Sequence, residues 1–316
     1  MSENVKIGVS ACLIGEKVRW NGMHERDRYL SEILAKHVEF IPLCPEIACG
    51  MGIPREQLRQ TDCAENIRLI GYESGDDLTQ KMTDWADRVL PGLEKEDLNG
   101  FVLKPRSPSC GMRHAKIYST TGKPPRLGSG FFARKLMTYA SLLPIETSDR
   151  LQNPIVRENF IRRVFVYKRW NQMLSKGKSI GNLVDFHTRH KMLIRAHDLR
   201  GYKELGSLLG QANQSNTDTT FNNYATLLFK TMTLKATAKK NSDVLFHAMG
   251  FFKKQLDLGD KQELQTAITA YQNGMIPLLI PVTLLNHYAR KYQKPYLTQQ
   301  YYLNPSPTEL QLLNHV

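Results

Sequence analysis

Three short apolar runs in the first third of the chain are each followed within a few residues by a cysteine. Their β-branched and aromatic content is typical of buried strands. Helices are expected between them at residues 28–37, with Leu30, Ile33 and Leu34 on the apolar face, and at residues 76–93. The runs are residues 5–9, 38–43 and 100–103, and the cysteines are Cys12, Cys44 and Cys110. Alternating strands and helices predict an α/β layer with a mainly parallel sheet.

The position of the three cysteines after the runs makes a stronger prediction. The carboxyl ends of parallel strands meet at one edge of the sheet, and ligands of α/β proteins bind beyond that edge. Cys12, Cys44 and Cys110 are 32 and 66 residues apart in the sequence, so only the fold can bring them together. We therefore expect the three thiols to converge on one site.

The second half of the chain has a different pattern. Residues 143–153, with Pro144 inside the segment and Pro154 directly after it, predict a linker. After it we expect helices over residues 156–174, 180–199, 221–239, 244–256, 261–273 and 281–291, and no strand. The prediction is an α/β domain at residues 1–150 followed by an all-α domain at residues 151–316.

Charge is divided as unevenly as the cysteines. All five cysteines lie in the first 110 residues. Residues 151–316 hold 22 Lys and Arg against 10 Asp and Glu, which is nearly all of the net charge of +13. This basic, cysteine-free half favours a nucleic acid partner, and the competing interpretation is a basic surface that serves solubility.

No run of 18 apolar residues is present, so the sequence predicts no membrane span and no membrane partner. The first residues lack the apolar core of a signal peptide, which predicts a cytoplasmic protein. Five cysteines, an odd number, in a reducing compartment favour metal binding or catalysis over disulfides.

Three thiolates alone cannot complete a tetrahedral zinc site, which needs a fourth ligand. They can hold three corners of a 4Fe-4S cluster and leave the fourth iron open to a substrate atom. The alternative from spacing alone is that these cysteines are small buried apolar residues.

At these residues the sequence resembles the thiouracil desulfidase family over about residues 4–150. The resemblance is carried by Ser10-Ala-Cys-Leu-Ile-Gly15 with Arg19-Trp-Asn-Gly22, by Cys44-Pro-Glu46 through Gly52-Ile-Pro-Arg55, and by Lys104-Pro-Arg-Ser-Pro-Ser-Cys-Gly111. It implies that Cys12, Cys44 and Cys110 bind a 4Fe-4S cluster with one open iron. It also implies a desulfuration without redox change, in which water replaces a thiocarbonyl sulfur.

Four further residues of these motifs are candidates for the chemistry. Glu46, two residues from a predicted ligand, is the candidate general acid or base, and its competing role is a salt bridge with Arg55. Ser107 matches the family serine and would position water or a substrate carbonyl, or else would only stabilise the turn; Ser109 is the less favoured serine. Lys104 and Arg106 would neutralise negative charge on the cluster or substrate, and their competing role is that of solvated surface side chains.

Two cysteines stand outside this pattern. Cys49 lies five residues after Cys44 and would close the open iron if it were a fourth ligand. We expect Cys49 to be a packing residue. Cys63 lies in a polar stretch, and we expect no role for it in the site.

The basic half contains a further set of motifs: Phe186-His-Thr-Arg-His-Lys191, His197, Tyr202-Lys-Glu-Leu-Gly206, His247-Ala-Met-Gly-Phe-Phe-Lys253 and Gln300-Tyr-Tyr-Leu-Asn-Pro305. In these motifs it resembles a second family, the YbgA-like helical domains, over roughly residues 160–310. The resemblance to proteins that fuse the two domains implies that the substrate is 4-thiouridine in tRNA and that the helical domain binds the RNA. Cations suited to phosphate contacts are Arg162, Arg163, Lys168, Arg169, Lys176, Lys178, Arg189, Lys191, Arg195, Lys253 and Lys254. Aromatic residues that either stack on bases or pack in the core are Tyr167, Trp170, Phe252, Tyr301 and Tyr302. The histidines His187, His190, His197 and His247 lack acidic partners, which favours core or RNA contacts over a metal site.

The function expected is therefore a non-redox desulfidase that acts on 4-thiouridine in tRNA or on thionucleosides. Within the same class, the alternative substrate is free thiouracil only. Different classes also remain open: an iron–sulfur redox enzyme with Cys49 as a fourth ligand, and an RNA-binding protein without enzymatic activity.

Overall fold

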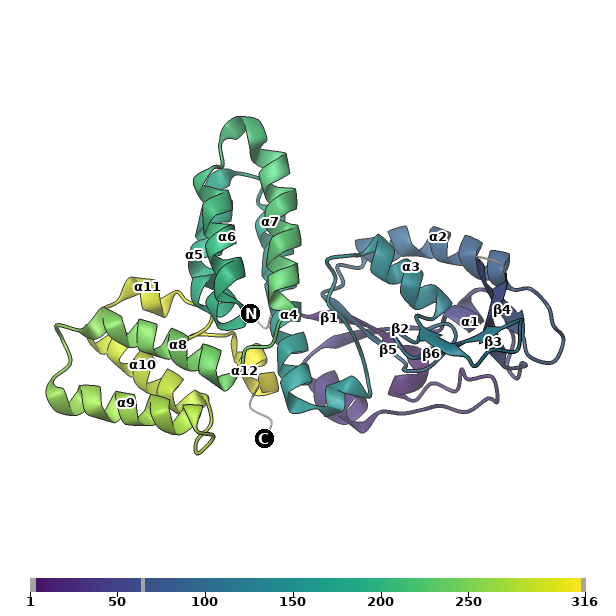
Figure 1. Ribbon diagram of the computed structural model, residues 1–316, viewed down its shortest axis with the longest axis horizontal. Helices are drawn as coiled ribbons and strands as arrows, with labels where there is room; N and C mark the ends of the chain where they lie inside the picture. Colours follow the sequence, from purple (N-terminus) through teal and green to yellow (C-terminus); the bar gives the residue numbers. More distant parts are fainter. Residues whose placement is uncertain (1–3, 64–65, 314–316) are drawn as a thin grey trace. The chain divides into compact units, whose positions relative to one another are not determined.

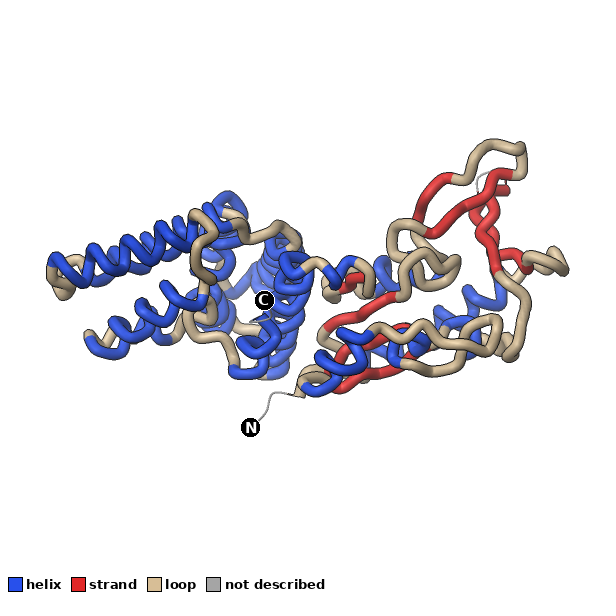
Figure 2. The backbone as a smooth tube through the Cα atoms, turned by 90° about the horizontal axis from the view of Figure 1, so that it is seen from below, coloured by secondary structure: helices blue, strands red, loops and turns tan. Residues whose placement is uncertain are grey.

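The structure is a computed structural model that describes residues 4–63 and 66–313. The chain divides into two compact units between Phe160 and Ile161, inside helix α4 (Pro154–Ser175). Strands occur in the first unit and helices dominate the second (Figures 1 and 2). The predicted α/β and all-α classes are confirmed. The predicted domain boundary at residue 150 stays a prediction, and the outer ends of both domains, residues 1 and 316, lie outside the described residues.

The central sheet of the first unit has four parallel strands in the order β2-β1-β5-β8. The strands are β1 (Lys6–Ser10), β2 (Glu39–Leu43), β5 (Gly100–Leu103) and β8 (Ile145–Thr147). Three of them are the apolar runs that precede Cys12, Cys44 and Cys110. β5 is buried at every position, as expected for a parallel strand covered on both faces.

A second sheet of mixed direction has the order β4-β3-β6-β7, in which β3 and β6 are parallel and the outer pairs antiparallel. Its strands are β3 (Leu58–Cys63), β4 (Asn66–Gly71), β6 (Ala115–Ser119) and β7 (Arg126–Gly128). Sequence reasoning missed β3 and β7. β3 is polar over most of its length and β7 has only three residues, so neither shows the apolar signal of a strand.

Two helices of the first unit, α2 (Thr79–Lys95) and α3 (Phe131–Tyr139), pack against each other (Figure 1). The ring of Phe132 on α3 lies 5.6 Å from that of Trp85 on α2 and 6.1 Å from that of Phe101 on β5, measured between centroids. These aromatic contacts bury large apolar areas and tie α3 to the central sheet. The short helix α1 (Pro45–Ala48) directly follows β2.

Two local predictions in the first unit were wrong. Residues 28–37, expected as one α-helix, form a π-helical turn at Tyr29–Ile33 and a 3-10 turn at Leu34–Lys36. Leu30 and Leu34 are buried, whereas Ile33, on the face expected to be apolar, is exposed. The expected linker at residues 143–153 supplies the fully buried edge strand β8 and a 3-10 turn at Arg150–Gln152.

The second unit is built of helices around an aromatic core. They are α5 (Ile180–His197), α6 (Leu199–Gly210), α7 (Thr217–Met232), α8 (Ala238–Met249), α9 (Leu258–Gln272), α10 (Leu279–Lys291), α11 (Pro295–Thr298) and α12 (Pro307–Leu313). Trp170 of α4 stacks on Tyr224 of α7 at 5.8 Å and contacts Phe186, Phe221 and Phe229. Among the described residues there is no helix long and apolar enough to cross a membrane.

Candidate functional site

The three cysteines follow three neighbouring strands of the central sheet. Ser10, the last residue of β1, lies opposite Leu43 of β2, so Cys12 and Cys44 leave the sheet side by side. β5 pairs with the other side of β1, and the loop after it carries Cys110. The topology therefore brings the three expected residues to one edge of the sheet, as the sequence predicts.

Cys12, Cys44 and Cys110 line one cavity of about 170 Å³ at this edge. Burial raises the pKa of Cys12 to about 12, and it raises the pKa of Cys44 as well. Burial also raises the pKa of Cys110 well above its usual value, and the nearby charges of Glu46, Cys44 and Cys12 add to that shift. Two buried thiols and the half-buried thiol of Cys44 around one cavity are stable as thiolates only beside compensating positive charge.

The donor set of the cavity fits an iron–sulfur cluster. Thiolates are the ligands that such clusters take, and this lining contains three thiols and no histidine. Within residues 4–63 and 66–313 no three His, Cys, Asp or Glu side chains are grouped closely enough to hold a single metal ion. A 4Fe-4S cluster takes its thiolates on separate irons and does not require such a single-ion group.

The loop that carries Cys110 is held rigidly by its own backbone and by α3. Oγ of Ser107 accepts hydrogen bonds from the amides of Ser109 and Cys110, each over 3.1 Å. The amides of Phe131 and Ala133, in the first turn of α3, donate to the carbonyls of Pro108 and Ser109 over 2.8 and 3.0 Å. The turn-stabilising role considered for Ser107 is therefore present in the structure, and its hydroxyl hydrogen is not used in either bond.

Gly130 explains why α3 can approach this loop so closely. A Cβ at this position would lie 2.6 Å from the carbonyl oxygen of Ser109 and 2.8 Å from the amide nitrogen of Gly111. Both are backbone atoms that cannot move aside cheaply, so a glycine is required between the helix and the cysteine loop. The Gly128-Ser-Gly130 sequence thus has a direct part in placing Cys110.

Glu46 is fixed from two directions. Oε2 forms a salt bridge with Arg55, which donates from Nε over 3.0 Å and from Nη2. Oε1 accepts a hydrogen bond from the hydroxyl of Ser109 over 2.7 Å. The salt bridge that competed with catalysis in the sequence interpretation is real, and it leaves Glu46 in the cavity lining beside the cysteines.

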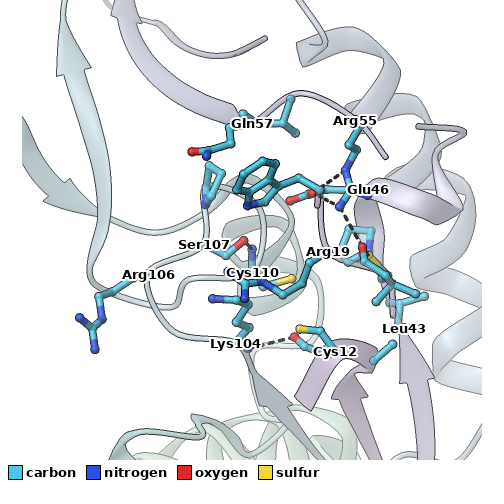
Figure 3. Close-up of a pocket in the computed structure, with 18 residues that line it drawn as sticks. Cys12, Arg19, Leu43, Glu46, Arg55, Gln57, Lys104, Arg106, Ser107 and Cys110 are labelled. Carbon is cyan, nitrogen blue, oxygen red and sulfur yellow. Dashed lines mark hydrogen bonds and ion pairs between the residues drawn. The ribbon is translucent and has the colours of Figure 1, made fainter. Parts of the chain in front are cut away.

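Positively charged side chains line the cavity, but not all of them point toward the cysteines. Lys104 lines it, and its ammonium group lies 3.0 Å from Glu25, which also pairs with Arg19 at 3.5 Å. Lys104 and Arg19 lower the pKa of Cys12, against the larger effect of burial. Arg106 also borders the cavity, but its exposed side chain points away from Glu46 and the labelled cysteines (Figure 3).

The two remaining cysteines lie apart from this site. Cys49 is buried and does not line the cavity; its thiol donates to the carbonyl oxygen of Glu46 over 3.4 Å. Cys63 ends strand β3 in the second sheet.

Two polar residues of the site were not singled out by sequence reasoning. Oγ of Ser10 accepts from the amide of Lys104 over 2.9 Å, and the Ser10 side chain lowers the pKa of Cys110, against the larger effect of burial. Ser109, the less favoured serine, is the one that bonds Glu46. Both serines are inside the recognised motifs, but only the fold shows which group each of them contacts.

The cations of the second unit that were expected to contact RNA differ in their exposure to solvent. Arg162, Lys168 and Arg169 are buried, so these three do not form the basic surface expected of them. Arg163, Arg189, Lys191 and Arg195 are half-buried, and Lys176, Lys178, Lys253 and Lys254 are exposed. Arg189 pairs with Asp185 at 3.0 Å and Arg195 with Asp243 at 2.8 Å. Periodic burial on the helices, not charge, decides which cations reach the surface.

The aromatic and histidine residues of this unit mostly lie in its core. Trp170, Phe252 and Tyr302 are buried, which supports the core role over stacking on bases, while Tyr301 is half-buried. His187, His190 and His197 are buried and His247 is exposed. None of these histidines belongs to a possible metal-binding group among the described residues.

Comparisons with known proteins bear on both halves. The protein YbgA of Escherichia coli K12 is 28% identical over 151 residues, covering 48% of this chain and 89% of YbgA. The protein YbbK of Bacillus subtilis 168 is 29% identical over 134 residues, covering 40% of this chain and 87% of YbbK. A solved structure, the 4Fe-4S-dependent thiouracil desulfidase TudS, has 27% identity and a TM-score of 0.38, with coverage of 47% of this chain and 94% of that one.

Family models match the two halves separately. The model that matches residues 7–148 is 2-thiouracil desulfurase, and the model that matches residues 191–307 is DUF1722, described as a protein of unknown function. The first range contains the cavity with its three cysteines, and the second lies wholly within the helical unit. In this polypeptide a segment that matches the 2-thiouracil desulfurase model therefore precedes a segment that matches the DUF1722 model.

Proposed function

We propose that this protein is a desulfidase that converts 4-thiouridine in tRNA to uridine and releases hydrosulfide, with no net redox change. The observation that carries the proposal is the cavity at the edge of the parallel sheet, where three thiols from three strand ends meet one fixed carboxylate. The match to the 2-thiouracil desulfurase family supports the class of reaction.

The proposed cofactor is a 4Fe-4S cluster held by Cys12, Cys44 and Cys110. When bound, such a cluster supplies a Lewis acid, an iron free of protein ligands, that polarises a thiocarbonyl group. Cys49 lies outside the cavity lining, which favours an open iron over the four-thiolate arrangement of an electron-transfer centre. Lys104 and Arg19 offset part of the negative charge that three thiolates bring into this buried site.

Glu46 is the proposed general acid or base. The net reaction replaces the thiocarbonyl sulfur with the oxygen of water, so both protons leave the water. One is delivered to the departing sulfur, which leaves as hydrosulfide, and the other is released to solvent. A carboxylate held by Arg55 and Ser109 presents its lone pairs in a fixed direction, which is what proton transfer requires. Ser107 also lines the cavity and still has a hydroxyl hydrogen to donate to water or to a ring carbonyl.

The proposed role of the basic half, residues 151–316, is to bind the tRNA. Its net charge of +12, from 22 Lys and Arg against 10 Asp and Glu, supports phosphate contacts. The expected cations that are accessible and form no ion pair within the described residues are Lys176, Lys191, Lys253 and Lys254, and Arg163 is half-buried. A thiouridine of folded tRNA must be turned out of its stack to enter a cavity, at a cost that phosphate contacts offset. The proposal places the protein in the cytoplasm, where tRNA is found.

The deciding experiment uses protein reconstituted under anaerobic conditions, with iron and sulfide content measured first. The protein is then incubated with thiolated tRNA and, separately, with free 2-thiouracil, and the near-UV absorption of each thiocarbonyl is followed. We expect the tRNA band to disappear with release of hydrosulfide, whereas protein without a cluster leaves it unchanged. An unchanged tRNA band beside loss of the free-base band would replace tRNA with free thiouracil as the substrate.

A further inference from the structure

Arg106 belongs to the walls of two neighbouring hollows in the first unit. It borders the cysteine cavity, from which its side chain points away in Figure 3. It also lines a second hollow, called here the basic depression, whose lining residues are Pro105, Arg106, Met112, Arg113, His114, Thr147 and Arg150. All of them lie in the first unit. The basic depression is therefore adjacent to the candidate active site, with Arg106 common to both.

The carboxyl end of the central sheet brings the lining of the basic depression together. Thr147 is the last residue of β8 and lies opposite Leu103, the last residue of β5. The loop after β5 carries Arg106, and Arg113 follows Cys110 in the segment that leads to β6. Ligands of α/β proteins bind beyond this edge, so the depression has the position of a ligand site next to the cysteines.

The basic depression is rich in guanidinium groups, and its lining among the described residues includes no Asp or Glu. Arg106 and Arg113 are exposed and form no ion pair within the described residues. Arg150 pairs with the buried carboxylate of Glu146, through Nε over 2.7 Å and Nη2 over 3.3 Å. The three guanidinium groups thus have one carboxylate between them, and their mutual repulsion is relieved when an anion binds.

Arg106 differs in two ways from the other cations that line the cysteine cavity. Arg19, Lys104 and Arg55 each pair with a carboxylate, whereas Arg106 has no such partner in the described part of the chain. Its backbone has a φ of 59°, in the left-handed region that is unfavourable for any residue other than glycine. Backbone held in such a conformation is concentrated at sites that bind ligands, which agrees with a binding role for Arg106.

The group that suits the basic depression is small and anionic. Its volume of about 10 Å³ is close to that needed by one water molecule or one phosphate oxygen, and it excludes a nucleobase. Guanidinium groups bind phosphate through paired N–H donors, and the exposed ring of His114 can donate as well. A nucleotide carries its phosphate on the ribose, away from the base, so its base and its phosphate can occupy neighbouring hollows.

We propose that Arg106, Arg113, His114 and Arg150 bind the ribose phosphate of a pyrimidine nucleotide whose thiocarbonyl group enters the cysteine cavity. This inference rests on the function proposed above and specifies its substrate: the first unit selects a phosphorylated nucleoside over a free base. It also assigns Arg106 to the phosphate instead of to the cluster.

The test is calorimetric titration of the full chain, reconstituted under anaerobic conditions, with uridine, uridine 5′-monophosphate, uridine 3′-monophosphate and inorganic phosphate. We expect at least one of the two monophosphates to bind about tenfold more tightly than uridine, because charge-assisted hydrogen bonds are added. Arg106→Ala and Arg113→Ala should each reduce this advantage several-fold. The matched control is Arg88→Ala, which removes an exposed arginine of α2 that lines neither hollow and should keep the advantage.

Turnover gives a second measurement. The ratio of kcat/KM for the 4-thio form of the tighter monophosphate to that for 4-thiouridine should fall in Arg113→Ala by about the same factor, through a higher KM. Thiolated tRNA should show a matching loss of kcat/KM in this variant, because its thiouridine carries the same phosphate. A loss with the monophosphate and none with tRNA would overturn the assignment of the site to RNA.

Three results of the titration would overturn the proposal. Equal affinity for uridine and both monophosphates would show that no phosphate is bound beside the cavity. Parent-like advantage in both Arg106→Ala and Arg113→Ala would place the phosphate elsewhere, and inorganic phosphate that binds as tightly as the monophosphates would leave only an anion site. Desulfuration of thiolated tRNA or free thiouracil alongside any of these results would reject the phosphate site and leave the desulfidase proposal standing.

Discussion

The hydroxyl of Ser109 donates a hydrogen bond to Oε1 of Glu46 over 2.7 Å, although 63 residues separate the two in the sequence. Ser109 precedes Cys110 and Glu46 follows Cys44 by two residues, so this bond connects the loops of two candidate cluster ligands. Arg55 holds the other carboxylate oxygen. The position of the candidate acid or base is therefore mechanically coupled to the positions of the thiols.

Glu46→Gln tests the acid–base role with little change of shape. The amide keeps an oxygen for one of the two partners but cannot take up a proton, so we expect turnover to fall about a hundredfold or more. Iron content should stay at the level of the parent protein. The matched control, Glu16→Gln, alters an exposed carboxylate of the same unit and should leave turnover unchanged. Parent-like turnover in Glu46→Gln would reduce Glu46 to a structural partner of Arg55.

Substituting each cysteine by serine or alanine tests the ligand assignment without any activity assay. Cys12→Ser, Cys44→Ser and Cys110→Ser should each lose most of the iron and sulfide bound after anaerobic reconstitution, because three thiolates are the minimum set. Cys49→Ala and Cys63→Ala should keep both, since neither residue lines the cavity. Loss of iron from Cys49→Ala would instead support the electron-transfer alternative.

Ser107→Ala separates the two roles considered for this serine. The amides of Ser109 and Cys110 would lose their acceptor, so we expect the free energy of unfolding to fall by about 1–2 kcal/mol, measured by chemical denaturation. If holding the turn is the main role, turnover per bound cluster should change by less than about threefold, well short of a catalytic effect. A large loss of turnover at unchanged stability would assign Ser107 to the chemistry.

Gly130→Ala tests whether close packing of α3 places the cysteine loop. The new Cβ would meet backbone atoms of Ser109 at 2.6 and 2.7 Å, so we expect a loss of about 2 kcal/mol or more in unfolding free energy, together with weaker iron retention. Gly92→Ala in α2 is the control, because its Cβ would meet no atom within 4 Å. This control should stabilise the helix by about 0.5–1 kcal/mol. Equal behaviour of the two variants would contradict the packing argument.

Acid should destabilise the helical unit through its buried histidines. Burial lowers the pKa of His187 to about 4 and that of His197 to about 3, from an ordinary value of 6.5. Below pH 6.5 these histidines bind protons in the unfolded chain but stay neutral in the folded chain. The free energy of unfolding therefore has its full value above pH 6.5 and decreases as the pH falls toward 4 and 3. Each histidine should contribute a slope of about 1.4 kcal/mol per pH unit within this window.

Denaturant titrations between pH 7 and pH 5 measure this slope. His187→Asn should flatten it by about the share of one histidine. His114→Asn, at an exposed position of the first unit, should not change it. A free energy of unfolding that stays constant over this range would show that the two rings can take up protons in the folded state.

Much of the first unit was predictable because its signals are local. The apolar runs before Cys12, Cys44 and Cys110 identify buried strands, and parallel connectivity then brings their ends to one edge. The polar strand β3 and the three-residue strand β7 were not predicted, because each is stabilised by pairing with neighbouring strands and not by its own apolar content. β8 was taken for a linker because two prolines flank a run of only three strand residues.

The sequence by itself determined the strand-end cysteines, the motif around each, and the basic helical half, because residue type and spacing are written along the chain. Tertiary structure alone decided that Ser109 and Arg55 hold Glu46, that Ser10 lowers the pKa of Cys110, and that Cys49 is outside the cavity. It also decided that Arg162, Lys168 and Arg169 are buried while Lys253 and Lys254 face solvent. The physical reason is that hydrogen bonds and burial depend on direction in space, and composition records how many charges a segment has but not where they point.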